Sequence, residues 1–153
     1  MIDFIYGAPG HLIRRLQQIA VALFLEETAA FDVTPPQFAA LVAVASYPGI
    51  DQRSLANAIA IDRSTIGDLV TRLEVRGLVA REPGDDRRTK SLTITPAGQD
   101  VIDGIIPHVV RVQERILGAL DAGERETFLA LLSRVVDIHN ELSRAPLARV
   151  DES

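Results

Sequence analysis

The sequence contains no cysteine and no tryptophan, and it has only one methionine and three histidines. Without cysteine the chain forms no disulfide, no zinc–thiolate site and no thiol-based redox sensor. The histidines, His11, His108 and His139, are scattered, and the sequence has no glycine-rich phosphate loop, HExxH motif or GxSxG motif. We therefore expect no enzyme, no bound metal and no cofactor.

Long hydrophobic runs are also missing, since no apolar stretch reaches the roughly 18 residues of a membrane span. The N-terminal sequence MIDFIYGAPGHLIRR lacks the basic start and the cleavage site of a signal peptide. A chain of 153 residues is about one domain long and can bury a core without covalent cross-links. We expect a single soluble, cytoplasmic domain that has no membrane partner.

Basic residues are outnumbered by acidic ones, 16 to 21, and the resulting net charge of −5 argues against a nucleic-acid partner for the chain as a whole. The segment 52–90 nevertheless carries eight basic and six acidic residues, so the acidic excess lies outside it. Fifteen of the sixteen basic residues are arginine, whose planar guanidinium suits phosphates and guanine edges. A genome rich in G and C would favour arginine equally, so the local charge is the better indicator.

The apolar spacing of the first third of the chain predicts helices. A long helix should cover residues 9–31 after a short arm of residues 1–8, with apolar residues on both faces. A helix that is apolar on both faces is typical of burial between two bodies. The next helix should begin at Thr34, with Pro35 in its first position and Gln37 completing a capping box.

The stretch from Gln52 to Thr95 predicts a helix-turn-helix followed by a β-hairpin. Asp51 should cap a helix over 52–60, and Asp62 should cap a second helix whose apolar residues point inward at helical spacing. The polar face of the second helix is typical of a recognition helix in a major groove, and a merely solvated face is the alternative. We assign to DNA in this segment the residues Arg53, Arg63, Ser64, Thr65, Asp68, Thr71 and Arg72.

The hairpin should form a wing. Gly77 ends the second helix, and strands are predicted over residues 78–82 and 91–95. The loop between them carries four charged residues that we assign to DNA: Asp86, Arg87, Arg88 and Lys90. Arg88 suits a narrow minor groove, and Asp86 would orient it. A loop charged in this way is usually only solvated, but its place directly after a helix-turn-helix favours the wing.

The C-terminal third predicts two more helices. Thr95 and Pro96 begin one that runs to about residue 120, and Asp121 with Glu124 begins the last, which runs to about residue 142. The last helix is apolar over more than one stripe. The fold class is therefore mainly α with a small β-wing. Residues 34–96 form the winged helix-turn-helix lobe, 1–33 and 97–145 form dimerisation helices, and 146–153 form a frayed tail.

This pattern resembles the MarR family of bacterial transcription regulators over nearly the whole chain. The motifs that carry the resemblance are Asp62-Arg63-Ser64-Thr65, Leu73-Glu74, Arg76-Gly77-Leu78-Val79, Arg81, Asp86-Arg87-Arg88, Leu92-Thr93 and Gly98. The wing signature, an Asp, one residue and an Arg before the Leu-Thr of the second strand, is the specific part. The resemblance implies that Arg88 enters the minor groove with Asp86 as its partner. It also implies a homodimer formed through the first and last helices.

The N-terminal sequence PGHLIRR followed by QQIAVALF resembles the subset of the family that controls aromatic-acid catabolism. The resemblance implies a small aromatic acid, or a larger aromatic acyl-CoA thioester, as ligand. His11, Arg15 and Gln18 recur on one helix face and could bind a carboxylate. Phe38 and Tyr47 could contact the ring. A polar cluster at a dimer interface is the alternative for the three polar residues.

The sequence thus predicts a homodimeric repressor that a ligand releases from a pseudo-palindromic, double-stranded DNA operator. A winged-helix module that binds a protein partner and never contacts DNA is the alternative, and the acidic net charge keeps it open.

Overall fold

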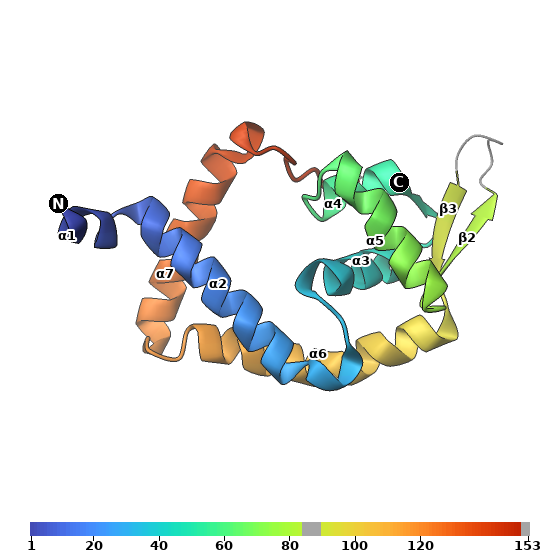
Figure 1. Cartoon of the computed structure of the whole chain (residues 1–153), viewed down its shortest axis with the longest axis horizontal. Coiled ribbons are helices and arrows are strands. Elements are labelled where there is room, and N and C mark those ends of the chain that lie inside the picture. Colours follow the sequence, from blue (N-terminus) through green and yellow to red (C-terminus); the bar gives the residue numbers. More distant parts are fainter. Residues whose placement is uncertain (84–89, 151–153) are drawn as a thin grey trace.

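The computed structural model describes residues 1–83 and 90–150, so Asp86, Arg87 and Arg88 of the expected wing lie outside the described residues (Figure 1). The first half contains α1 (Ile2–Tyr6), α2 (Pro9–Glu27), the 3₁₀ turn η1 (Ala29–Phe31), α3 (Pro35–Ser46), β1 (Ile50–Asp51), α4 (Gln52–Ala58) and α5 (Arg63–Val75). The second half contains β2 (Val79–Pro83), β3 (Lys90–Ile94), α6 (Pro96–Ile116), α7 (Ala122–Ile138) and the 3₁₀ turn η2 (Asn140–Leu142). The predicted class, mainly α with a small β-wing, is confirmed. Within these two ranges, no helix has both the length and the apolar character of a membrane span.

The predicted helix starts are confirmed because each depends on residues within one turn. Thr34 and Gln37 form the predicted capping box: the Gln37 N–H donates to Thr34 Oγ1 at 3.4 Å, and the Thr34 N–H donates to Gln37 Oε1 at 3.0 Å. Asp121 and Glu124 form the same motif with two contacts of 2.9 Å. The side chain of Asp51 caps α4 by accepting from two backbone N–H groups.

Several boundaries differ from the prediction. Residues 2–6 form the short helix α1, where an arm was expected. The helix α2 ends at Glu27, because the chain passes through a 3₁₀ turn to Asp32, which has a left-handed φ of 51°. The strand β1 was not predicted, since two residues are too few to show an alternating pattern.

The sheet has the order β1–β3–β2, and both pairings are antiparallel. Leu92 in the central strand faces Ile50 of β1 on one side and Arg81 of β2 on the other. Its side chain is 1% exposed and belongs to the core of the lobe that α3, α4 and α5 surround. The hairpin β2–β3 follows α5 directly, as the wing prediction requires.

The close junction between α6 and β2 depends on Gly98. This glycine is buried in the first turn of α6, and its N–H donates to the cap residue Thr95. The Thr95 hydroxyl also donates to Gly77 O at 2.6 Å, beyond the end of α5. A Cβ at residue 98 would lie 2.1 Å from Leu78 O, so only glycine fits here without a shift of the backbone.

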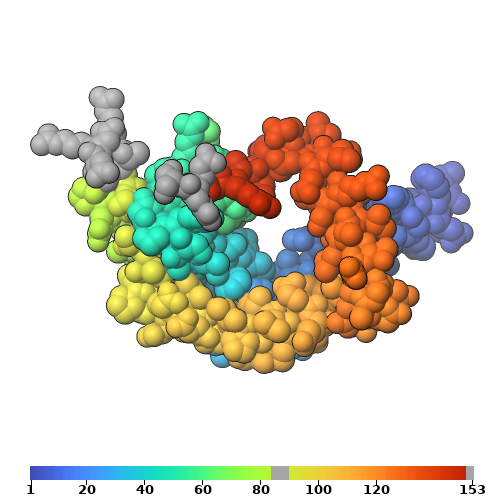
Figure 2. Space-filling model, turned by 180° about the vertical axis from the view of Figure 1, so that it is seen from behind, coloured from blue at the N-terminus to red at the C-terminus, as the bar shows by residue number. Residues whose placement is uncertain are grey.

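The helices α2, α6 and α7 and the helix-turn-helix lobe together surround a hollow. Figure 1 shows α2 crossing α6, with α7 turning back beside α2. Figure 2 shows, from behind, that the segment after α7 spans the hollow and reaches the helix-turn-helix lobe.

Glu27 joins α2 to α6, because its carboxylate contacts Arg115 Nη1 at 2.8 Å and Arg111 Nε at 3.2 Å. These hydrogen bonds, first from Arg115 and then from Arg111, hold the pKa of Glu27 below its ordinary value.

The segment 146–150, for which the sequence predicts a frayed tail, contacts the rest of the chain. The Leu147 N–H and C=O groups bond to the side chain of Asn140, at 2.9 and 3.1 Å. The Ala148 N–H donates to Asn57 O at the end of α4, and Val150 packs against the core. The sequence does not reveal these contacts, because the partner of Ala148 is a backbone carbonyl far away in the chain and the bonds of Leu147 use its backbone groups.

Candidate nucleic-acid interface

The helix α5 presents one buried and one exposed face. Ile66, Leu69, Val70 and Leu73 are buried in the lobe, as their helical spacing predicts. The opposite face carries Ser64, Asp68 and Thr71, which are all exposed. In Figure 1 this helix lies at the outer edge of the lobe, next to the β2–β3 hairpin. The arrangement of an exposed helix beside a hairpin can engage a groove and the adjacent backbone of a duplex.

Asp62 organises the first turn of α5. Its Oδ1 accepts from Ser64 Oγ at 2.5 Å, from the Thr65 N–H at 3.2 Å and from Thr65 Oγ1 at 3.0 Å. Its Oδ2 lies 2.8 Å from Arg144 Nη2, which comes from the segment after η2. These contacts, first the Ser64 hydroxyl and then Arg144 and Thr65, hold the pKa of Asp62 well below its ordinary range. The carboxylate therefore stays ionised at neutral pH.

Arg81 connects the hairpin to the exposed face of α5. Its Nη2 donates to Thr71 Oγ1 at 3.1 Å. Its Nε lies 3.1 Å from Glu74 Oε2, without the alignment of a hydrogen bond. The residue belongs to β2 and is half-buried, so the hairpin and α5 hold a fixed relation at this point. The sequence marked Arg81 as a family residue but gave no partner for it.

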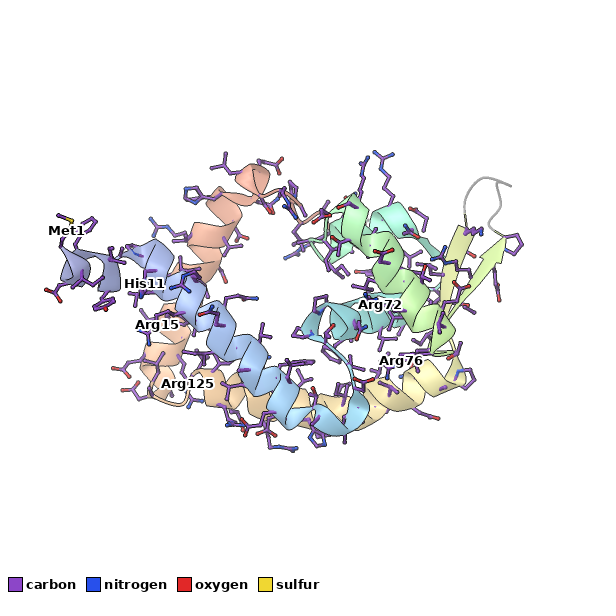
Figure 3. All side chains as sticks on the ribbon, viewed as in Figure 1. Met1, His11, Arg15, Arg72, Arg76 and Arg125 are labelled. Atoms are coloured by element: carbon purple, nitrogen blue, oxygen red, sulfur yellow. The ribbon has the colours of Figure 1, made fainter. Side chains whose placement is uncertain are left out.

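Arg76 fixes the other end of α5. Its guanidinium donates to Asp32 O at 2.5 Å and to Phe31 O at 3.0 Å, in the turn between α2 and α3 (Figure 3). Asp51 caps the start of α4, as Asp62 caps the start of α5. Burial would raise the pKa of Asp51, but hydrogen bonds from the Ser54 hydroxyl and the N–H groups of Ser54 and Arg53 lower the pKa overall.

The residues assigned to DNA do not all share one face. Arg53, Arg63 and Lys90 are exposed at the starts of α4, α5 and β3. Thr65, Asp68 and Arg72 line an open groove of about 290 Å³ on the flank of α5, together with residues at the start of α3. Only Asp68 also belongs to the outward face that Ser64 and Thr71 share. The helical period explains this split, because Thr65 and Arg72 are seven residues apart on one shoulder of the helix.

The polar residues assigned to a ligand do lie together, near the start of α2. Arg14 contacts His11 Nδ1 at 3.4 Å and Gln18 Oε1 at 3.3 Å, and Arg15 projects from the same part of the helix (Figure 3). The ring of His11 also lies 5.7 Å from the ring of Tyr6 in α1. Arg14 was not assigned by the sequence, although its charge and its place beside Arg15 could have indicated it.

One protomer does not bring this polar cluster to the two aromatic residues. Phe38 packs against Phe24, with ring centroids 6.0 Å apart, and Tyr47 packs against the core at the end of α3. Phe24 is thirteen residues after His11 in α2. At 1.5 Å per residue this is a separation of roughly 20 Å along the helix, more than a small aromatic acid can span.

A second groove, of about 310 Å³, lies between α2, α6 and α7. Its walls are mostly apolar, with Leu16, Ile116, Phe128 and Leu132 among them, and Gln17 and Gln113 are its polar residues. The groove borders the exposed apolar residues of α2 and α7, so a second helical body could cover it.

The exposed helix, its caps and the adjoining hairpin define a winged helix-turn-helix protein. A model of the MarR family matches residues 31–89. The chain is 35% identical over 129 residues to the transcriptional repressor NicR of Pseudomonas putida. The aligned region covers 84% of this chain and 82% of NicR. The chain therefore belongs to the MarR family, and it is a transcriptional regulator of the DNA-binding type.

Two solved structures of this type are similar over most of their length. The Bordetella bronchiseptica regulator BpsR, whose DNA binding is regulated by 6-hydroxynicotinic acid, has a TM-score of 0.80 and 29% identity, covering 86% of this chain and 95% of that one. The transcriptional repressor CouR, bound to a 23-mer DNA duplex, has a TM-score of 0.82 and 26% identity, covering 89% of this chain and 97% of that one.

Proposed function

We propose that the chain is a homodimeric repressor that binds a pseudo-palindromic operator and leaves it when a small aromatic acid binds. The exposed polar face of α5, capped by Asp62 and tied to the hairpin by Arg81, is the observation that carries the DNA-binding part. The protein is therefore proposed to read a duplex with the first turns of α5 and to contact the backbone beside it.

Exposed apolar side chains at the two ends of the chain support the dimer. In α7, Leu131, Val135 and Ile138 are 55%, 52% and 71% exposed. In α1 and α2, Phe4 and Ile13 are 81% and 55% exposed. Large apolar patches of this kind mark interfaces in soluble proteins, and a second copy would cover both ends at once. The two recognition helices of such a dimer would meet successive major grooves about 34 Å apart.

The ligand that we propose is an aromatic acid bound at His11, Arg15 and Gln18. The regulation of BpsR by 6-hydroxynicotinic acid supports this class of compound. An arginine and two hydrogen-bonding side chains on one helix face suit a carboxylate. Since Phe38 and Tyr47 lie far from this face within one protomer, we propose that the second copy supplies the ring contacts. An aromatic acyl-CoA thioester would need a longer site, with arginines near its phosphates.

The Arg15→Ala variant tests the proposed release. In fluorescence anisotropy with a selected operator, 6-hydroxynicotinate and related aromatic acids should release the wild-type protein. The variant should keep its operator affinity and lose the response, because the guanidinium that pairs with the carboxylate is gone. Arg149→Ala, an equal loss of charge at an exposed site in the C-terminal segment, serves as the control and should respond normally.

Two results would contradict this part of the proposal. If Arg15→Ala loses operator binding without any ligand, the cluster belongs to the dimer interface. If only CoA thioesters of aromatic acids release the wild-type protein, the larger ligand is correct. A chain that binds no duplex at all would favour the winged-helix module that recognises a protein.

A further inference from the structure

Two hydroxyl groups on the exposed face of α5 have neighbours that fix their hydrogen-bonding roles. Ser64 and Thr71 are seven residues apart and both are exposed, so they lie on one face of the helix. The separation along the axis is about 10.5 Å at 1.5 Å per residue. This corresponds to about three base-pair steps of 3.4 Å, so the two hydroxyls would face different bases.

The hydroxyl proton of Ser64 is already donated in a hydrogen bond within the protein. Ser64 Oγ lies 2.5 Å from Asp62 Oδ1, and an ionised carboxylate can only accept, so the hydroxyl must donate in this contact. The carboxylate cannot easily turn away, because the Thr65 N–H bonds to the same oxygen and Arg144 pairs with the other. The oxygen of Ser64 therefore presents only lone pairs to a molecule that approaches α5.

Thr71 is in the opposite situation. Its Oγ1 accepts from Arg81 Nη2 at 3.1 Å, and a guanidinium can only donate. Within residues 1–83 and 90–150, no group accepts the proton of this hydroxyl. Arg81 also forms an ion pair with Glu74, which lies one helical turn after Thr71 in α5. Thr71 therefore keeps a proton that it can donate.

We propose that Asp62 and Arg81 are positioning residues that set opposite roles for these hydroxyls at the operator. Ser64 accepts a hydrogen bond from an exocyclic amino group, which in the major groove is adenine N6 or cytosine N4. Thr71 donates to an acceptor, such as guanine O6 or N7 or thymine O4. The inference rests on the proposed DNA binding and names the atoms through which α5 would distinguish bases.

The test is a set of double-mutant cycles between protein and base. An operator is first selected from random duplexes with the full-length protein. At each base pair, one functional group is then removed. Purine replaces adenine and 2-pyrimidinone replaces cytosine, which removes the amino group. 7-Deazaguanine or 2-aminopurine replaces guanine, which removes N7 or O6, and 5-methyl-2-pyrimidinone replaces thymine, which removes O4. The affinity of every duplex is measured by anisotropy at one salt concentration for the wild-type protein, Ser64→Ala and Thr71→Val. The cycle cancels any effect of the analogue on the duplex itself.

For Ser64→Ala we expect coupling to the loss of one amino group. Removing that group should weaken wild-type binding about fivefold, the value of an ordinary hydrogen bond, and should leave the variant unaffected. For Thr71→Val, which keeps the size of the side chain, coupling should appear only with the loss of an acceptor, about three base pairs away. Thr71 thus serves as the matched control for Ser64, because both are hydroxyls on the same face.

Asp62→Ala tests the positioning role. In this variant the hydroxyl proton of Ser64 no longer has the carboxylate as its acceptor and can be donated to a base. The coupling of Ser64 should therefore extend to an acceptor at the same base pair. Circular dichroism must first show that the variant has wild-type helix content. If the variant does not fold, the Ser64 and Thr71 cycles still decide the matter, because both substitutions keep the Asp62 carboxylate and its bond to the Thr65 N–H.

If Ser64 couples only to hydrogen-bond acceptors of the bases in the otherwise wild-type protein, it donates its hydrogen bond to DNA. That result would overturn the proposal that Ser64 accepts. The absence of coupling at every base pair would overturn the assignment of Ser64 to bases while leaving DNA binding intact. If the selection enriches no sequence and no duplex binds, the proposed function fails instead, so the two failures are distinguishable.

Discussion

Replacing Leu131 and Val135 of α7 by aspartate should convert the protein to a monomer and lower operator affinity by roughly 100-fold or more. Both side chains are about half exposed in the protomer, and they are one helical turn apart. In a dimer they would be buried, and an unpaired carboxylate there is costly. Each recognition helix would then bind its half-site alone, without the second contact that the dimer provides.

The measurements are light scattering after size exclusion and anisotropy with the selected operator. Ser133→Asp is the matched control, because Ser133 lies on the polar side of α7 with Glu126 and Asp137. It should leave the mass and the affinity unchanged. If the double variant remains a dimer with normal affinity, α7 does not form the interface, and the exposed apolar residues of α1 and α2 must be tested instead.

The Gly98→Ala variant should lose about 3 kcal/mol of unfolding free energy, near the upper end of the usual effect of overpacking. The added Cβ would lie 2.1 Å from Leu78 O and 2.6 Å from Ile94 Cδ1. The first of these is a backbone atom at the start of the hairpin and cannot rotate away. The start of α6 or the hairpin must therefore shift, which should also move the hairpin relative to α5 and weaken operator binding.

Urea denaturation at one fixed protein concentration measures this effect, since the stability of a dimer depends on concentration. Gly10→Ala is the control, because a Cβ at residue 10 meets no atom within 4 Å. Alanine is the better helix former, so the control should change stability by less than about 1 kcal/mol. If the Gly98→Ala protein is as stable as the control, the backbone at the junction of α6 and β2 shifts at little cost, and the prediction is wrong.

The sequence predicted the helices well because their signals are local. The capping boxes at Thr34 and Asp121 involve residues three apart, and the buried face of α5 follows from the helical period. The strand β1 escaped prediction, since two residues show no pattern and pair only because β3 is already in place. The short helix α1 likewise has no side-chain cap to indicate its start.

The contacts that fix the recognition helix could not be predicted, because they join residues far apart in the chain. Arg76 reaches Phe31, and Arg144 reaches Asp62 across 82 residues. A surface arginine has many possible partners, and the fold alone selects one. The division of the exposed residues of α5 into an outward face and a flanking groove also depends on how the start of α3 packs beside it.

The salt dependence of operator binding tests the central claim most directly. If the dimer neutralises about six phosphates, the logarithm of the association constant should fall with the logarithm of salt concentration with a slope of about −5. The slope should be shared by the selected operator and by unrelated duplexes, with a clear preference for the operator at every concentration. A flat response without sequence preference would contradict the account and indicate a winged-helix protein that recognises another protein.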